Sequence, residues 1–158
     1  MMFFSAALAH LLAVMSPGPD TAIIFHQSFA KGRRESTLTA LGIGFGIFVH
    51  CFFAISGISL LIYSTEEAKV LIKIFGGLYL LYIGLSFFVF NKPSSKNDSK
   101  SFLQNPLLIG LITNLLNVKA FLFTVSLFSF IDLGSNFFVA LIYLLYFPIV
   151  TAAWFTFL

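Results

Sequence analysis

The sequence predicts an all-α integral membrane protein, a polytopic bundle of five transmembrane helices. Hydrophobic residues make up 59% of the 158-residue chain, Phe alone occurs 22 times, and charged residues contribute only 9%. A water-soluble domain of this size cannot bury so much apolar surface. The charges separate apolar stretches close to the ~20 residues that a helix needs to cross a bilayer. These stretches are continuous rather than alternating, which favours helices over a β-barrel.

The five apolar segments follow one another along the chain. They are expected at about 2–30, 37–62, 69–90, 106–131 and 136–158. The opening stretch lacks the basic region of a signal peptide, and its apolar run resumes beyond Pro19, so it is expected to be a membrane segment. A stretch rich in Ser, Lys and Asn, 91–105, has the composition of a solvated linker. It divides the chain into a three-helix repeat, 1–90, and an incomplete second repeat of two helices, 106–158.

The basic residues predict how the chain is oriented in the membrane. Six of the nine lie in two loops, 31–36 and 91–105, namely Lys31, Arg33, Arg34, Lys92, Lys96 and Lys100. The positive-inside rule places both loops in the cytoplasm. The loop that holds Glu66 and Glu67, and the N-terminus, are then external. Because most of the basic residues lie in these two loops, nucleic acid is not an expected partner, whereas the lipid bilayer is.

Two of the apolar segments are interrupted by helix-breaking or polar residues. The first segment carries Ser16, Pro17, Gly18, Pro19 and Asp20 in succession, and the fourth carries the polar stretch 113–119. A helix broken inside a membrane leaves backbone groups unpaired unless they line a cavity enclosed by protein. Both breaks fall in the opening segment of their half, which is the pattern of repeats that meet at a central binding site. The predicted fold is therefore of the inverted-repeat transporter type, with broken first and fourth helices.

The first break offers an anion site and a titratable acid. Pro19 can begin a new half-helix after the kink, and free N–H groups near Asp20, Thr21 and Ala22 would form a partial positive charge that suits a carboxylate. The Asp20 carboxyl could exchange a proton or pair with a substrate ammonium group. The alternative interpretation is a simple proline kink, which membrane helices tolerate.

The second break offers amides and a cation. Asn114 and Asn117 supply donors and acceptors, and Lys119 is the only basic residue inside a predicted crossing and away from its ends. Asp20 and Lys119 could neutralise each other. Residues 16–21 together with Asn114, Asn117 and Lys119 are therefore the predicted substrate-binding residues. The alternative for Lys119 is a side chain that extends toward the membrane interface.

The histidines and the cysteine carry less information. His50, within the second segment, is either a second proton-coupling group beside Asp20 or a buried polar contact between helices. His10 and His26 are less informative. Cys51 is the only cysteine, so neither a disulfide nor a Cys-based metal site can form within one chain. No metal or cofactor is expected.

Several motifs resemble the LysE/RhtB family of amino-acid exporters over nearly the whole chain. They are Ser16 to Asp20, Lys31 to Arg34, Gly42 to His50, Tyr79 to Gly84 and Asn114 to Ala120. The resemblance implies export of amino acids from the bacterial cytoplasm across the inner membrane, driven by protons. His50 and the Pro-Gly-Pro-Asp sequence resemble the threonine and homoserine exporting branch. The second segment also has no acid that would attract a cationic side chain.

The sequence departs from this family pattern in two places. The family usually has Pro where this chain has Val118 between Asn117 and Lys119. Family members also have about six membrane segments, whereas this sequence reaches Leu158 in the fifth, so the last segment is expected to be lacking.

Three functions remain open at this point. The first is a secondary transporter whose partners are an amino acid and protons, with homo-oligomerisation left open. The second is a truncated, non-transporting remnant or packing subunit of the same fold. The third is an intramembrane enzyme that uses His50 and Asp20 as an acid–base pair, for which the chain offers no HExxH motif or Cys/His cluster. The prediction is a transporter and not an enzyme.

Overall fold

A computed structural model of the chain describes residues 2–57, 65–67, 70–71, 74, 78, 105–131 and 137–158. Six helices account for most of these residues: α1 (Met2–Met15), α2 (Pro19–Lys31), α3 (Arg33–Ile55), α6 (Pro106–Leu115), α7 (Val118–Phe130) and α8 (Phe137–Phe157). The predicted third segment, 69–90, and the predicted linker, 91–105, lie almost entirely outside the described residues. The all-helical fold class is confirmed.

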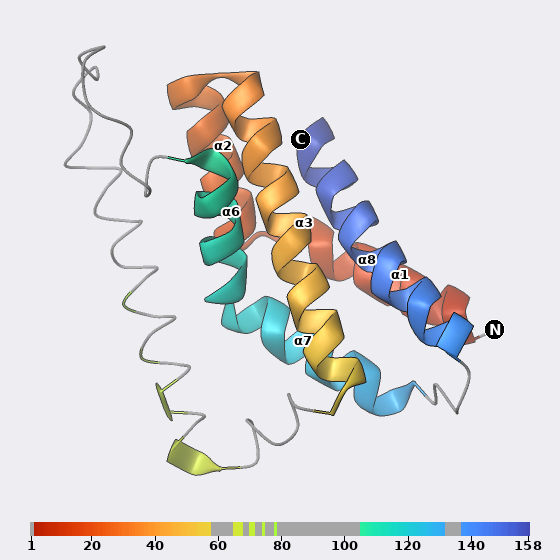
Figure 1. Cartoon of the computed structure of the whole chain (residues 1–158). Coiled ribbons are helices and arrows are strands. Elements are labelled where there is room, and N and C mark those ends of the chain that lie inside the picture. Colours follow the sequence, from red (N-terminus) through yellow and green to blue (C-terminus); the bar gives the residue numbers. More distant parts are fainter. Residues whose placement is uncertain are drawn as a thin grey trace.

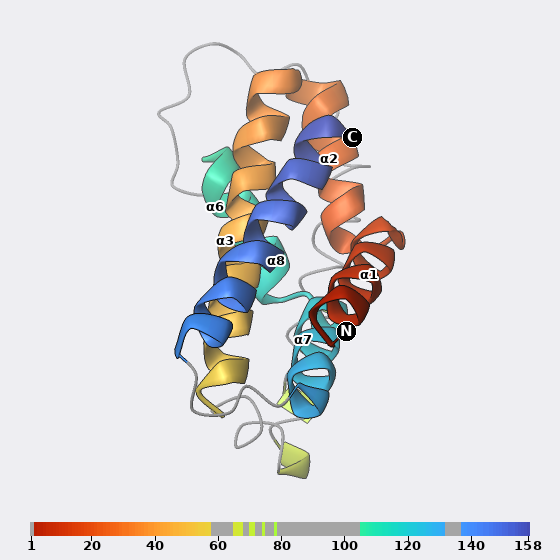
Figure 2. The same ribbon diagram turned by 90° about the vertical axis from the view of Figure 1, so that its right-hand side faces the viewer.

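The long helix α3 is the centre of the described bundle. Helices α6 and α8 pack against it most extensively, and α2 and α7 also contact it (Figure 1). After a quarter turn, α8 is seen to lie along α3, with α1 beside it (Figure 2). The two broken helix pairs, α1 with α2 and α6 with α7, are therefore both held by the same central helix.

Two glycines allow α3 and α6 to approach each other closely. A Cβ atom on Gly42 of α3 would collide with the backbone carbonyl of Leu107, and one on Gly110 of α6 would collide with that of Thr39. Backbone contact of this kind is the usual function of small residues between membrane helices. The packing fixes the position of α6, and hence of the break that follows it, relative to α3.

The first break lies between α1 and α2, whose axes differ by 53°. Helix α1 ends at Met15, and α2 begins with Pro19, whose fixed φ and missing N–H suit the first position of a helix. Gly18, the residue before α2, has no side chain that could cap the helix. The break therefore leaves the N-terminus of α2 without a side-chain cap.

The second break lies between α6 and α7, whose axes differ by 58°. It requires no proline, because Asn117 ends the turn and its side-chain oxygen accepts the backbone N–H groups of Lys119, at 3.1 Å, and Ala120, at 3.4 Å. An asparagine in this role satisfies N–H groups that a new helix leaves unpaired. The absence of Pro at Val118 therefore does not remove the break.

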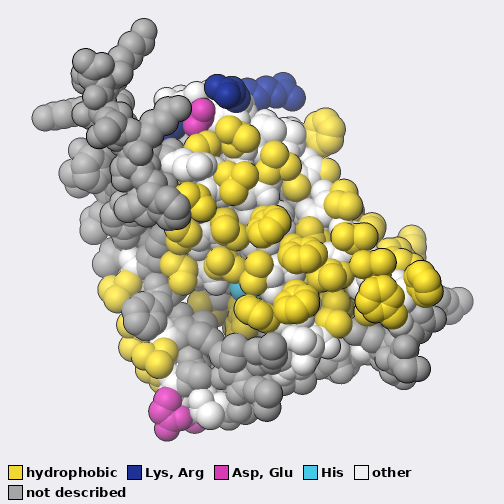
Figure 3. All heavy atoms as spheres, viewed as in Figure 1, with side chains coloured by type: hydrophobic (Ala, Val, Ile, Leu, Met, Phe, Trp, Pro, Cys, Tyr) yellow, Lys and Arg dark blue, Asp and Glu magenta, His cyan; other side chains and the backbone are white. Residues whose placement is uncertain are grey.

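The surface of the described residues fits a bilayer. Helices α3 and α8 are each long and apolar enough to cross a membrane, and each bent pair has the composition of one broken span. Hydrophobic side chains cover the face in Figure 3, between Lys and Arg side chains at one end and acidic side chains at the other. The exposed basic residues at the turn between α2 and α3 are Lys31, Arg33 and Arg34, and Glu66 and Glu67 are also exposed.

Candidate functional site

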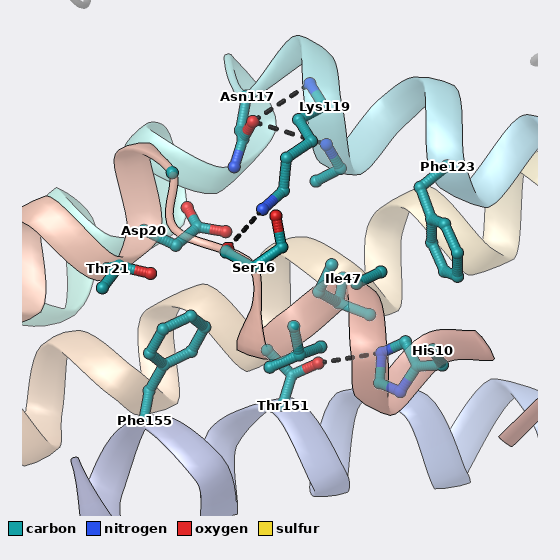
Figure 4. Close-up of a pocket in the computed structure, with 14 residues that line it drawn as sticks. His10, Ser16, Asp20, Thr21, Ile47, Asn117, Lys119, Phe123, Thr151 and Phe155 are labelled. Atoms are coloured by element: carbon teal, nitrogen blue, oxygen red, sulfur yellow. Dashed lines mark hydrogen bonds between the residues drawn. The ribbon is translucent and has the colours of Figure 1, made fainter. Parts of the chain in front are cut away.

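The two helix breaks meet inside the bundle. The Asn114 side-chain amide, at the end of α6, donates a 2.8 Å hydrogen bond to the Asp20 carboxylate, at the start of α2. The Lys119 ammonium group, at the start of α7, donates at 2.6 Å to the backbone carbonyl of Ser16. Two contacts between residues about a hundred positions apart thus join the first break to the second. Figure 4 shows the second of them, from Lys119 to Ser16.

Asp20 is buried at this junction, with 8% of its surface exposed. Only one of its oxygens, Oδ2, has a hydrogen-bond partner among the described residues; Oδ1 is buried without one. A buried carboxylate requires compensation by charge or hydrogen bonds. Asp20 and Lys119 attract each other electrostatically, and the Lys119 ammonium group lies between Asp20 and Ser16 in Figure 4. This carboxylate therefore retains capacity for a further cationic or hydrogen-bonding partner.

The N-terminus of α2 is close to this carboxylate. The sequence predicted free N–H groups near Asp20, Thr21 and Ala22. The Ala22 N–H is not free, because it donates to the Gly18 carbonyl at 3.0 Å. No side chain caps the helix. The start of α2 therefore keeps part of the positive end that the sequence predicted, and it differs in this respect from α7, which Asn117 caps.

The two polar atoms of the Asn117 side chain lie in different surroundings. Its oxygen caps α7. Its Nδ2 is buried and interacts favourably with the Asp20 carboxylate, but it makes no hydrogen bond of ordinary geometry within the part of the chain that the structure describes. Figure 4 shows this nitrogen on the side of the residue that faces Asp20. A buried donor without a hydrogen bond costs free energy. A ligand that accepts a hydrogen bond from Asn117 Nδ2 would recover this free energy.

His50 supports the second break from α3. Its Nε2 lies 3.0 Å from the backbone oxygen of Asn114, an oxygen that also accepts the N–H of Asn117. Gly46, one turn before His50 on α3, leaves room for the Asn114 side chain, which a Cβ atom there would overlap. His50 and Gly46 thus fix the position of Asn114, which contacts Asp20. His50 itself does not line the cavity described next.

A cavity of about 40 Å³ lies at the junction of the breaks. Its lining comes from α1, α2, α3, α7 and α8: His10, Ala13, Val14, Ser16, Gly18, Asp20, Thr21, Ile47, Asn117, Lys119, Ala120, Phe123, Thr151 and Phe155. This volume has room for a few water molecules. One acid and one lysine therefore face a shared cavity whose lining is otherwise mostly apolar.

The predicted site residues divide into two groups. Those that line the cavity are Ser16, Gly18, Asp20, Thr21, Asn117 and Lys119. The others do not line the cavity but support it. Pro17 and Pro19 form the first break, Asn114 bonds Asp20, and His50 bonds the Asn114 backbone.

Sequence reasoning missed two polar residues of the lining, His10 and Thr151. His10 is 3% exposed and Thr151 is 1% exposed, and the Thr151 hydroxyl lies 3.1 Å from the His10 Nε2. The signal was present, because a histidine within an apolar membrane segment is by default a candidate functional residue. The sequence alone does not show that this histidine lies on the same side of the helix as the break.

Metal binding has no support among the described residues, where no group of three or more His, Cys, Asp or Glu side chains is arranged to hold an ion. The cavity instead presents one acid, one lysine, neutral polar groups and aromatic rings. Such a site matches a small molecule that carries both a cationic and an anionic group.

The chain is similar to members of one known protein family. Residues 11–158 match the family model described as LysE type translocator. The chain is 33% identical to the threonine efflux protein of Salmonella typhi and 32% identical to that of Escherichia coli K12, in both cases over 86% of this chain and 68% of the relative. It is 30% identical to the leucine efflux protein of Enterobacter sp. strain 638, over 85% of this chain and 65% of that protein. No solved structure gives a significant match.

Proposed function

The chain belongs to the LysE type translocator family, a family of transporters and not of enzymes, and we propose that it exports small neutral amino acids from the cytoplasm by antiport with protons. The observation that carries this proposal is that Asp20 and Lys119, from the two helix breaks, line one cavity. The relatives named above are efflux proteins for threonine and for leucine, two neutral amino acids.

The charges of the cavity fit an amino-acid zwitterion. Asp20 is suited to the substrate ammonium group, and its Oδ1 lacks a partner among the described residues. Lys119 and the uncapped start of α2 are suited to the carboxylate. Once the ammonium and carboxylate groups of the substrate are matched, the lining residues within the described part of the chain offer no further carboxylate for a cationic side chain. This charge balance favours a neutral amino acid.

Transport requires this cavity to enlarge. Room for a few waters is too little for an amino acid, so the helices that line it must separate to admit a substrate. The breaks supply two bends at which α1 can move relative to α2, and α6 relative to α7. We propose that residues 1–90 and 106–158 belong to two inverted repeats that rock against each other around the site, with 91–105 as the cytoplasmic linker.

Asp20 is the proposed coupling group. Its carboxylate can be neutralised either by the substrate ammonium or by a proton, and these two partners exclude each other at one small site. Competition of this kind couples outward movement of the amino acid to inward movement of a proton. His50 holds the Asn114 backbone, so we assign it a positioning role and leave proton exchange to Asp20.

Efflux of radiolabelled amino acids tests the proposed function. Bacterial cells that express the chain and are loaded with labelled threonine should release it faster than cells that express the Asp20→Asn, Lys119→Met double variant at the same level. Loading with labelled lysine or glutamate should give equal release from the two. Equal threonine release would contradict the proposal.

Cysteine labelling tests the proposed orientation in the plasma membrane. In a Cys51→Ser background, which removes the one native thiol, a cysteine at Glu35 should resist an impermeant maleimide in intact cells, because the positive-inside rule places the turn between α2 and α3 in the cytoplasm. A cysteine at Glu67, which is exposed, should react from outside.

Permeabilised cells provide the control for this labelling. Both cysteines should react once the reagent can reach the cytoplasm, which shows that Glu35→Cys is accessible and not hidden by packing. Reaction of Glu35→Cys in intact cells, with protection of Glu67→Cys, would reverse the orientation.

A further inference from the structure

The cavity has a second polar end, away from the charges of Asp20 and Lys119. It is formed by His10 of α1 and Thr151 of α8, with Ile47, Phe123 and Phe155 nearby in the lining. Figure 4 shows His10 and Thr151 joined by their hydrogen bond, across the cavity from Asn117 and Lys119. One end of the cavity is thus charged, and the other is neutral, polar and partly aromatic.

The Thr151 hydroxyl differs from those of four of the six other threonines in the described helices. These four donate to the carbonyl four residues earlier in their own helix: Thr39, Thr113, Thr124 and Thr156. Thr151 instead turns toward His10 across the gap between α8 and α1, with its oxygen 3.1 Å from Nε2. The Thr151 hydroxyl therefore bonds a residue of another helix in the cavity lining, and not its own helix.

His10 is held in place as a polar group among aromatic rings. Its ring centroid lies 4.5 Å from that of Phe147 and 6.1 Å from that of Phe123. The second ring nitrogen, Nδ1, is buried and has no hydrogen-bond partner in the described part of the chain. A buried histidine with one nitrogen bonded to a hydroxyl and the other unpaired is not explained by packing alone.

The bond between Thr151 and His10 can be exchanged at little cost. A helical threonine always has an alternative acceptor, the carbonyl one turn earlier, which is Phe147 for Thr151. Neutral imidazole offers one donor and one acceptor. A ligand hydroxyl, which is also both donor and acceptor, can therefore replace Thr151 at His10 without leaving either group unpaired.

We propose that His10 and Thr151 form the subsite for the substrate side chain and select amino acids with a short, hydroxyl-bearing side chain over aliphatic ones of the same size. This inference rests on the proposed function, because it takes the charged end of the cavity as the site of the ammonium and carboxylate groups. The side chain of such a substrate then extends toward α1 and α8.

Threonine and valine are the sharpest pair of ligands, because they differ by one hydroxyl in place of a methyl group. A rigid site that bonds a hydroxyl rejects the apolar analogue strongly, since its own polar groups are left unpaired. Here His10 and Thr151 bond each other when valine is bound, so the preference for threonine should be only about tenfold.

The test measures binding of labelled threonine, and its competition by unlabelled valine, to the purified protein in detergent. The wild-type chain should prefer threonine by about tenfold. Thr151→Val should raise the preference to about a hundredfold by strengthening threonine binding alone, because His10 then has no partner unless the ligand hydroxyl bonds it. Thr151→Ser, which keeps the hydroxyl, should retain the preference. Thr156→Val is the matched control, because its hydroxyl bonds its own helix, and it should also leave the preference unchanged.

The outcomes separate this inference from the proposed function. Threonine binding by the wild type with the same preference in Thr151→Val would overturn the subsite and leave the exporter proposal standing. A wild-type chain that binds neither amino acid would overturn both. A change of preference in Thr156→Val as large as that in Thr151→Val would also overturn the subsite, because the effect would then not be specific to the cavity.

Discussion

Replacement of Asp20 by Asn should abolish efflux driven by a pH gradient while leaving exchange of substrate for substrate. Asn keeps the size of the side chain and an oxygen that can accept the Asn114 amide, so the join between the two breaks is retained. It removes the negative charge that substrate and proton compete to neutralise. Exchange needs no net proton transfer, so it requires only that the site still binds and reorients.

Proteoliposomes allow the two activities to be measured on one protein. In Asp20→Asn, the rate of gradient-driven efflux of labelled threonine should fall to that of liposomes without protein. Counterflow of labelled threonine into proteoliposomes loaded with unlabelled threonine should persist at a reduced rate. Glu35→Gln makes the same chemical change in a half-buried acid at the turn between α2 and α3, and it should alter neither activity. Unchanged gradient-driven efflux in Asp20→Asn would show that this acid is only a structural partner of Asn114.

The breaks could be predicted from sequence because their causes are local. Pro17, Gly18 and Pro19 cannot continue a helix without a kink, whatever surrounds them. The second break was expected within 113–119 from its polar residues and lies at Leu116 and Asn117. Its geometry depends on the Asn117 side chain bonding two backbone N–H groups, a common capping pattern that compensates for the absence of proline.

The partners across the cavity could not be predicted, because they depend on how helices pack. Asp20 and Lys119 were expected to neutralise each other, and they attract each other electrostatically. Their hydrogen-bond partners were not predicted: the Lys119 ammonium group donates to the Ser16 carbonyl, and Asn114 is the residue that bonds Asp20. That choice follows from the close packing of α3 on α6, which sets where Asn114 lies. Composition and spacing do not encode it.

The polar residues of α1 and α8 show the same limit more clearly. His10 lies six residues before the first break, and Thr151 belongs to a segment with no break at all, so neither belongs to a motif. Their importance appears only when α8 places Thr151 next to His10, within 3.1 Å of its Nε2. Sequence reasoning thus finds residues that distort the backbone more readily than residues that complete a site from an undistorted helix.

Replacement of Lys119 by Met should weaken substrate binding without removing the response to the proton gradient. Met keeps the length and most of the volume of the side chain, but it cannot pair with a carboxylate. Lys119 is an exposed residue, and an exposed charge pair contributes up to about 1 kcal/mol, so the affinity for threonine should fall by up to about fivefold. Gradient-driven efflux should remain detectable at saturating substrate, since Asp20 is intact.

The substrate carboxylate itself provides the decisive control for this assignment. Threonine amide keeps the ammonium group and the side chain but has no negative charge, so the wild-type chain should bind it much more weakly than threonine. Lys119→Met should lose affinity for threonine but not for the amide, so the difference in affinity between the two ligands should become smaller. An equal loss of affinity for both ligands would mean that Lys119 acts through its bond to the Ser16 carbonyl, as a support for the first break, and not through the substrate.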